Sequence, residues 1–461
     1  MAVGRSVRGF ANLCPVAIDG QKARRCRSWP RLPAALAWML VLGTIAGCGG
    51  GHAATTSRRT QSSPQSPATT TSAGPASSPT VPAPRAQVLY GWGRGSPPVP
   101  SFWRVPRTVN GATGGLRGRP LATEIPGVVG RIVQITTSNT AGYALTANGE
   151  VWAWGEGLEG QLGDGTLSAY AASAVRVRFP AGVRIAALPD PVPYDGGMAI
   201  GTNGHVWAWG NNTAGQFCRR RPSYPTVPVE VPLAHVTLAA GALFHTIYDS
   251  RGKIYTCGLG NLGQLGDGAR NHRSRPTRVL GLPAGHVVAL TNSWGDAGAL
   301  LADGAYYDWG YNRAGQVGDG TRRLADAAVH VPLPGRVVKV SQGGCLPNNG
   351  QTMALLADGS LWEWGNNRFG QLGDGNTRNA LAPIHLIEPP GVRFVKVDSG
   401  GAANYALDGS GHLWSWGLNN VGQLGGGVVS RVQLTPVRDD VILTQVSSTA
   451  NEVAGFFNPQ G

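Results

Sequence analysis

The chain has 461 residues, of which 69 are glycine, 33 are proline and 14 are tryptophan, and only 14% are charged. This composition excludes a protein of long surface helices and favours short strands joined by tight turns. The formal net charge is +14, but residues 1–47 hold seven basic residues and one acidic residue, so +8 remains for the rest of the chain. No aromatic and basic pattern accompanies this mild excess, so we expect no nucleic-acid partner.

Residues 1–47 predict an export signal. A basic stretch from Lys22 to Arg31 precedes an apolar run over 32–47 that is short for a membrane span and ends in small residues. The first twenty residues fit neither a signal peptide nor a folded unit and are interpreted as an over-called start. Residues 45–48, Ile-Ala-Gly-Cys, resemble the bacterial lipobox, which makes Cys48 the predicted lipidation site. An ordinary signal peptide cut nearby, or an uncleaved anchor, is the alternative.

Residues 48–87 are interpreted as the lipidated cysteine followed by a disordered linker. After Cys48 the chain is a low-complexity run of Ser, Thr, Pro, Ala and Gly, which cannot bury a core and serves as a tether. The N-terminal segments together predict an extracytoplasmic protein of the bacterial cell envelope, attached to the membrane by its lipid alone.

Residues 88–461 contain seven copies of a strand motif that ends in Trp-Gly or a variant of it. The copies begin 48 to 62 residues apart and occupy 89–93, 151–155, 206–210, 254–258, 306–310, 361–365 and 413–417. A second strand precedes most copies through an Asn-Gly or Asp-Gly pair, which predicts a two-residue hairpin turn. A third strand lies upstream and a short fourth one downstream. Four antiparallel strands per repeat predict an all-β, seven-bladed β-propeller. We expect the motif tryptophans to pack between blades as structural residues: Trp154, Trp209, Trp309, Trp364 and Trp416.

A glycine loop follows most copies of the strand. It reads Gly-Gln-Leu-Gly-Asp-Gly at 160–165, 263–268 and 370–375, has Val for Leu at 315–320, ends in Gly-Gly at 422–427 and is cut to Gly-Gln-Phe-Cys at 215–218. Its aspartates are interpreted as turn caps, because one carboxylate per blade cannot supply the six to eight oxygen ligands of calcium. They are Asp164, Asp267, Asp319 and Asp374.

The strand motif and the glycine loop together resemble the regulator of chromosome condensation repeat, over residues 88–461. The resemblance implies a seven-bladed propeller, and it leaves function open. The founding member is a nuclear exchange factor for a small GTPase. Secreted bacterial members include propellers that inhibit β-lactamases by covering the active-site mouth, and the export signal makes them the nearer analogy.

The sequence shows no constellation for an enzyme, a metal site or a cofactor. Histidines are scattered, and His245, at a strand start, is interpreted as a hydrogen-bonded structural residue. Three cysteines remain after export, Cys218, Cys257 and Cys345. Their spacing matches no metal site, and we expect small buried residues or at most one bridge.

Function is expected where the repeat varies, in the loops that precede the second strands. These loops supply the candidate partner-binding rim: Tyr194, Phe244, Trp294, Leu346 and Asn349. Exposed aromatics on one face are typical of protein interfaces, although residues that merely cap the central channel would look the same. We therefore predict a non-enzymatic, surface-anchored protein interaction platform, for instance one that binds or inhibits an envelope enzyme. The alternatives are an envelope carbohydrate-binding module or hydrolase and, less favoured, an exchange-factor-like activity.

Overall fold

The structure is a computed structural model that describes residues 88–93, 123–138, 140–220, 223–344, 350–419, 424, 432–443, 445–448 and 452–457. All of them belong to one of the two units of the chain, Val81–Gly461. The predicted signal peptide, Cys48 and the linker lie outside the described residues, as do Leu346 and Asn349. No helix within the described ranges is long and apolar enough to cross a membrane.

Six blades in the described part of the chain are each built from four consecutive antiparallel strands. Blade 1 contains β3 (Ile132–Thr137), β4 (Ala141–Thr146), β5 (Val151–Glu156) and β6 (Tyr170–Arg176). Blade 2 contains β7 (Ile185–Ala187), β8 (Gly196–Gly201), β9 (Val206–Gly210) and β10 (Val229–Glu230). Blade 3 contains β11 (Val236–Gly241), β12 (His245–Ser250), β13 (Lys253–Gly258) and β14 (Arg273–Arg278).

The remaining three of these blades follow the same order. Blade 4 contains β15 (Val287–Asn292), β16 (Asp296–Leu301), β17 (Tyr306–Gly310) and β18 (Ala325–His330). Blade 5 contains β19 (Val337–Gly343), β20 (Gln351–Leu356), β21 (Leu361–Gly365) and β22 (Ala380–His385). Blade 6 contains β23 (Phe394–Ser399), β24 (Ala403–Asp408), β25 (His412–Leu418) and β26 (Val432–Ile442).

The first motif copy does not form a blade of its own, which corrects the prediction of one blade per motif copy. It forms β1 (Val88–Gly93), which pairs with β2 (Thr123–Glu124) on one side and β28 (Glu452–Phe457) on the other. Strand β27 (Gln445–Ser448) completes this composite sheet in the order β2-β1-β28-β27. Seven motif copies therefore give six blades of consecutive strands, because strands from both ends of the described chain share the remaining sheet.

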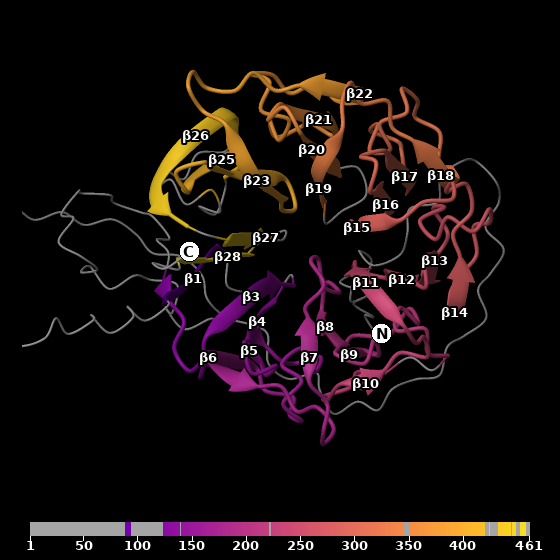
Figure 1. Ribbon diagram of the computed structural model, residues 1–461, viewed down its shortest axis with the longest axis vertical. Helices are drawn as coiled ribbons and strands as arrows, with labels where there is room; N and C mark the ends of the chain where they lie inside the picture. Colours follow the sequence, from indigo (N-terminus) through magenta and orange to yellow (C-terminus); the bar gives the residue numbers. More distant parts are fainter. Residues whose placement is uncertain are drawn as a thin grey trace, which may run out of the picture. The chain divides into compact units, whose positions relative to one another are not determined.

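The innermost strands of the sheets contact one another around a central axis (Figure 1). Strand β15 contacts β11 and β19, and β23 contacts β19 and β27, which in turn contacts β3. Between blades 1 and 2 the side chain of Gln134 donates to the Leu188 carbonyl at 2.6 Å and accepts from the Leu188 N–H at 2.9 Å. Successive sheets are therefore joined at their inner edges.

The hairpins between second and third strands differ from the predicted two-residue turns. In blade 1, Thr146 donates its backbone N–H to Glu150, which leaves a three-residue loop closed by Gly149 at φ 79°. This is the turn-plus-bulge hairpin, in which only the glycine needs positive φ. The two-residue turn occurs at Arg251-Gly252 of blade 3, where both residues have positive φ, 55° and 72°.

Alternating strand directions give the ring two different faces. The connections from first to second strand and from third to fourth strand lie on one side, which we call the loop face. The hairpins from second to third strand and the connections to the next blade lie on the other, the turn face. Both the candidate rim loops and the glycine loops therefore belong to the loop face.

The motif tryptophans are buried where one blade meets the next. The indole of Trp309 is fully buried, and its Nε1 donates to the Gln264 carbonyl in the glycine loop of the preceding blade, at 3.1 Å. Gly266 of that loop has φ 62°, and a Cβ there would lie 2.8 Å from the indole. The same contact recurs for Trp209 on Gln161 and Gly163, Trp364 on Gln316 and Gly318, and Trp416 on Gln371 and Gly373. Trp154 is 1% exposed and packs on Gly142.

The loop aspartates bind within their own turns. Asp319 accepts from the Thr321 backbone N–H and from the Asn312 side chain, each at 2.9 Å. Asp164, Asp267 and Asp374 likewise accept the backbone N–H two residues further on. Each carboxylate thus satisfies a turn that the flanking glycines make possible.

Candidate functional site

The first-to-second strand loops of blades 1 to 6 converge on a hollow at the loop-face mouth of the central channel. Its volume is about 60 Å³, and its walls include Tyr194, Leu243 and Trp294, together with glycines of blades 3, 5 and 6. A site for a drug-sized ligand usually has roughly 300 to 1,000 Å³. The hollow therefore fits one inserted side chain better than a metabolite.

Two of the predicted rim residues, Tyr194 and Trp294, line this hollow together. Both are half-buried, and Trp294 packs edge-on against Tyr311 with 6.2 Å between ring centroids. Phe244 is also half-buried but does not line the hollow. The structure thus brings two of the five candidate residues to one place, and Leu346 and Asn349 lie outside its description.

The loop that carries Tyr194 is tied to the next blade by its backbone. The Tyr194 N–H donates to the Ala242 carbonyl at 3.3 Å, and the Gly241 N–H donates to the Pro191 carbonyl at 2.8 Å. Backbone bonds fix loops more firmly than exposed side chains do, because buried N–H and C=O groups must be paired. The mouth of the channel is therefore held in shape by the blades that form it.

A buried polar cluster lies beside the hollow, where blades 4 and 5 meet. The Gln342 amide nitrogen donates to Asp308 at 2.7 Å and to Asp296 at 3.1 Å. Tyr306 donates to Asp308 at 3.1 Å, and Ser293 donates to Asp296 at 2.5 Å. The two carboxylates are at most 2% exposed, and they do not line the hollow. This placement favours a role in joining the blades over contact with a substrate.

Burial raises the pKa of both carboxyl groups. The pKa of Asp296 rises to about 7, and that of Asp308 rises well above its usual range because burial is reinforced by the charge of Asp296. Like charges this close share a proton near neutral pH. Glu363, at the position of Asp308 in the next blade, is also fully buried, and burial raises its pKa well above the ordinary value.

His245 is a buried neutral residue of the same region. The Asn292 amide nitrogen donates to its Nε2 at 2.5 Å and to the Asp296 carbonyl at 3.2 Å. Burial lowers the pKa of His245 to about 3, so the imidazole is uncharged at neutral pH. Asn292 itself lines the hollow, which connects its wall to this internal network.

The loop face carries opposite charge on different blades. Near the junction of blades 1 and 2, burial and the charges of Glu159 and Glu156 raise the pKa of Asp195 to about 7. Residues 157–169, the glycine loop of blade 1, contain no Lys or Arg. The glycine loops of blades 2 to 5 instead carry exposed arginines: Arg219, Arg220, Arg270, Arg313, Arg322, Arg323, Arg368 and Arg378. Such separation of charge can fix the orientation of a docking protein.

No group of three or more His, Cys, Asp or Glu side chains is arranged to hold a metal ion in the described ranges. The sequence interpretation missed the cluster of Asp296, Asp308 and Gln342. A signal was available in the sequence. Asp308 and Glu363 occupy the middle of the Trp-Gly strand, at the position that is Ala153 in blade 1 and Ala208 in blade 2. A charged residue at a buried strand position indicates a polar partner in the neighbouring blade.

A sequence profile of the Regulator of chromosome condensation (RCC1) repeat matches residues 251–291 and 358–407. The Ultraviolet-B receptor UVR8 of Arabidopsis thaliana is 29% identical over 321 residues, which cover 68% of this chain and 71% of the receptor. The mitochondrial RCC1 domain-containing protein RUG3 of the same plant is 26% identical over 340 residues, 68% of this chain and 74% of that protein.

Solved structures agree on the fold. Human WBSCR16 superposes with a TM-score of 0.68 at 22% identity and covers 81% of this chain and 99% of its own. Prp20p of Saccharomyces cerevisiae superposes with a TM-score of 0.66 at 21% identity, covering 80% and 91%. These relatives are plant, human and yeast proteins, and they do not test the expected likeness to secreted bacterial members. The chain is a β-propeller of four-stranded antiparallel blades, and its residues 251–291 and 358–407 match the RCC1 repeat.

Proposed function

We propose that this propeller is a non-enzymatic platform that binds a protein partner at its loop face. The observation that carries the proposal is the hollow between Tyr194 and Trp294, which has room for a side chain of a partner and little more. Aromatic residues at the centre of a face, surrounded by polar loops, are typical anchors of protein interfaces. Prp20p, which has a similar fold, binds Gsp1p and histones, so such propellers can serve as protein-binding surfaces.

The composite sheet serves, in this proposal, as the seventh blade. It has four antiparallel strands like the others, and its strand β27 contacts both β23 and β3. A closed ring leaves no blade face uncovered between the first and the last blade. The loop face then surrounds the channel mouth completely, which gives the partner one continuous docking surface.

We further propose that Cys48 is lipidated and that the protein is attached to the cell envelope, outside the cytoplasm. A disulfide joins Cys218 to Cys257, and disulfides persist mainly in oxidising compartments. Strand β1 begins at Val88 on the turn face, because Val88 pairs with Phe457 at the end where other blades have their hairpins. The linker predicted to end at residue 87 would therefore enter the ring at the face opposite the hollow.

The test is capture by the purified full-length protein with a matched pair of variants. Tyr194→Ala with Trp294→Ala is expected to abolish capture of the partner from envelope extract, while the thermal midpoint stays nearly unchanged. Ile387→Ala, which removes an 85% exposed side chain from the turn face, is the control and should capture normally. Capture that survives the double substitution would refute the rim assignment, and retention of glycans without protein would favour a carbohydrate-binding module.

A further inference from the structure

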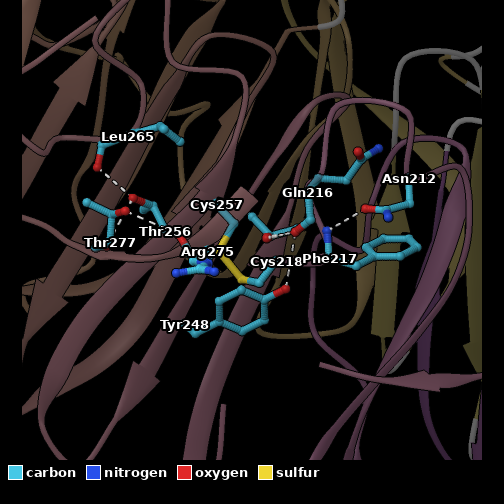
Figure 2. Close-up of a disulfide and its surroundings, with 11 residues drawn as sticks. Asn212, Gln216, Phe217, Cys218, Tyr248, Thr256, Cys257, Leu265, Arg275 and Thr277 are labelled. Atoms are coloured by element: carbon cyan, nitrogen blue, oxygen red, sulfur yellow. Dashed lines mark hydrogen bonds between the residues drawn. A yellow bond between two sulfur atoms is a disulfide. The ribbon is translucent and has the colours of Figure 1, made fainter. Parts of the chain in front are cut away.

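The junction between blades 2 and 3 departs from the repeat at two facing positions. Elsewhere, between described blades, a tryptophan of the following blade packs on a left-handed glycine of the preceding glycine loop. Here Cys257 stands in the place of the tryptophan, and Cys218 stands in the place of the glycine. The two form a disulfide with 5.2 Å between Cα atoms and 39 residues between them in sequence (Figure 2).

The strand register establishes that Cys257 occupies the tryptophan position. Cys257 pairs with Thr246 in β12, as Trp309 pairs with Ala297 in β16. Cys218 has φ 55°, close to the φ of 62° at Gly266. A side chain in this left-handed slot is tolerated because no indole lies against it, whereas a Cβ on Gly266 would meet Trp309 at 2.8 Å.

Neighbouring residues occupy the room that an indole would need. Tyr248 is fully buried beside the disulfide (Figure 2), at a strand position that is alanine in blades 1, 2, 4, 5 and 6: Ala144, Ala199, Ala299, Ala354 and Ala406. Its hydroxyl donates to the Gln216 carbonyl at 3.5 Å, and the Thr246 hydroxyl donates to the same oxygen. At the other junctions between blades 1 to 6, the tryptophan Nε1 donates to the carbonyl of the equivalent glutamine.

The exchange changes what holds the two blades together. An indole joins neighbouring blades by burying a large apolar surface, which needs no redox chemistry. Two thiols in its place bury much less, and beside the hydrogen bonds of Tyr248 and Thr246 the covalent bond between Cys218 and Cys257 is the redox-sensitive part of the connection. We propose that this junction is a redox-dependent lock, closed by the disulfide and loosened by its reduction, at a ring whose other described junctions between blades 1 to 6 are independent of redox state. This proposal does not rest on the proposed function.

Reduction of this disulfide by a dithiol is a balanced two-electron exchange. The reductant supplies two electrons and two protons, the S–S bond breaks to give the thiols of Cys218 and Cys257, and the dithiol closes to its own cyclic disulfide. Both sulfurs belong to buried residues, 3% and 0% exposed. A reductant therefore reaches the disulfide only when the junction between blades 2 and 3 opens. A variant without the disulfide gives the loosened form directly.

The experiment is amide hydrogen exchange, followed by mass spectrometry, on the oxidised full-length protein and its Cys218→Ser, Cys257→Ser double variant. Loss of the crosslink is expected to lower protection of β12 and β13 by about 30- to 1000-fold. The whole-protein thermal midpoint is expected to fall by about 3 to 5 °C. Peptides around Trp309 serve as the internal control and should keep their protection.

A second variant restores the arrangement of the other junctions and separates the lock from general damage. It combines Cys218→Gly, Cys257→Trp, Tyr248→Ala and Phe217→Leu, the last because the other loops have Leu or Val there. Protection that returns and no longer responds to dithiothreitol supports the lock. Equal protection in the oxidised protein and the serine variant would overturn it, and so would a restored variant that stays sensitive to reductant. If the restored variant does not fold, the serine comparison decides alone.

Discussion

The contact of each tryptophan with a glycine of the preceding blade can be tested at Gly266. Replacing Gly266 by alanine places a methyl group 2.8 Å from Trp309 and 3.1 Å from Val279, at a residue with φ 62°. A left-handed backbone costs a residue with a Cβ about 1 to 2 kcal/mol, and overpacking a tight site costs about 1 to 3 kcal/mol more. The free energy of unfolding should therefore fall by about 2 to 5 kcal/mol.

The control for this substitution is Gly375→Ala, in the glycine loop of blade 5. Gly375 has φ 80°, and a Cβ there meets nothing within 4 Å, so only the backbone cost of about 1 to 2 kcal/mol applies. Urea denaturation of both variants, followed by tryptophan fluorescence, gives the two free energies at a common slope. Equal losses at Gly266 and Gly375 would show that the indole does not press on the loop, and the reasoning would fail.

Two further outcomes follow from the carboxylates and the N-terminus. Because the folded pKa is about 7 for Asp296 and well above the usual range for Asp308, the folded state holds protons that the unfolded state has lost. The free energy of unfolding should therefore fall as pH rises from about 4, the unfolded pKa of an aspartate, through the folded pKa of about 7 and beyond it, by about 1.4 kcal/mol per pH unit for each proton that only the folded state still holds. Neutral His245, with a folded pKa of about 3, opposes this only below pH 6.5. Asp308→Asn should flatten the slope in thermal melts, and a slope equal to wild type would contradict the assignment. Finally, Cys48→Ser should release the protein into the medium, as a fractionation blot would detect, and retention in the membrane fraction would exclude the lipid anchor.

The strands could be predicted because the same local sequence patterns recur from repeat to repeat. The Trp-Gly strand, the glycine loop and the positive-φ glycine of the hairpin act through neighbouring residues, and they recur with little change. The hairpin length was mispredicted because Asn148-Gly149 favours a two-residue turn in isolation. The bulge at Gly149 and the bond from Thr146 to Glu150 are set by the register of the whole sheet.

Features that join different blades were harder to predict. The cluster of Asp296, Asp308 and Gln342 forms only when blades 4 and 5 meet, and the sequence distance between its members hides the contact. The pairing of Cys218 with Cys257 was left open for the same reason, although an alignment of the copies places them at the facing glycine and tryptophan positions. At the rim, the sequence indicated which loops vary, and the fold decides that Tyr194 and Trp294 share a hollow while Phe244 does not line it.

The composite sheet also constrains the order of folding. Strand β1 leaves the ribosome, or an export channel, before every other described strand, yet its long partner β28 follows all the rest. Blades 1 to 6 can form from strands that are close in sequence, whereas this sheet requires the most distant pairing in the described chain, and such pairings form slowly. Until β28 arrives, the edge of β1 that it will occupy is open to incorrect pairing. Efficient production of the protein therefore depends on how well β1 avoids other strands during that interval.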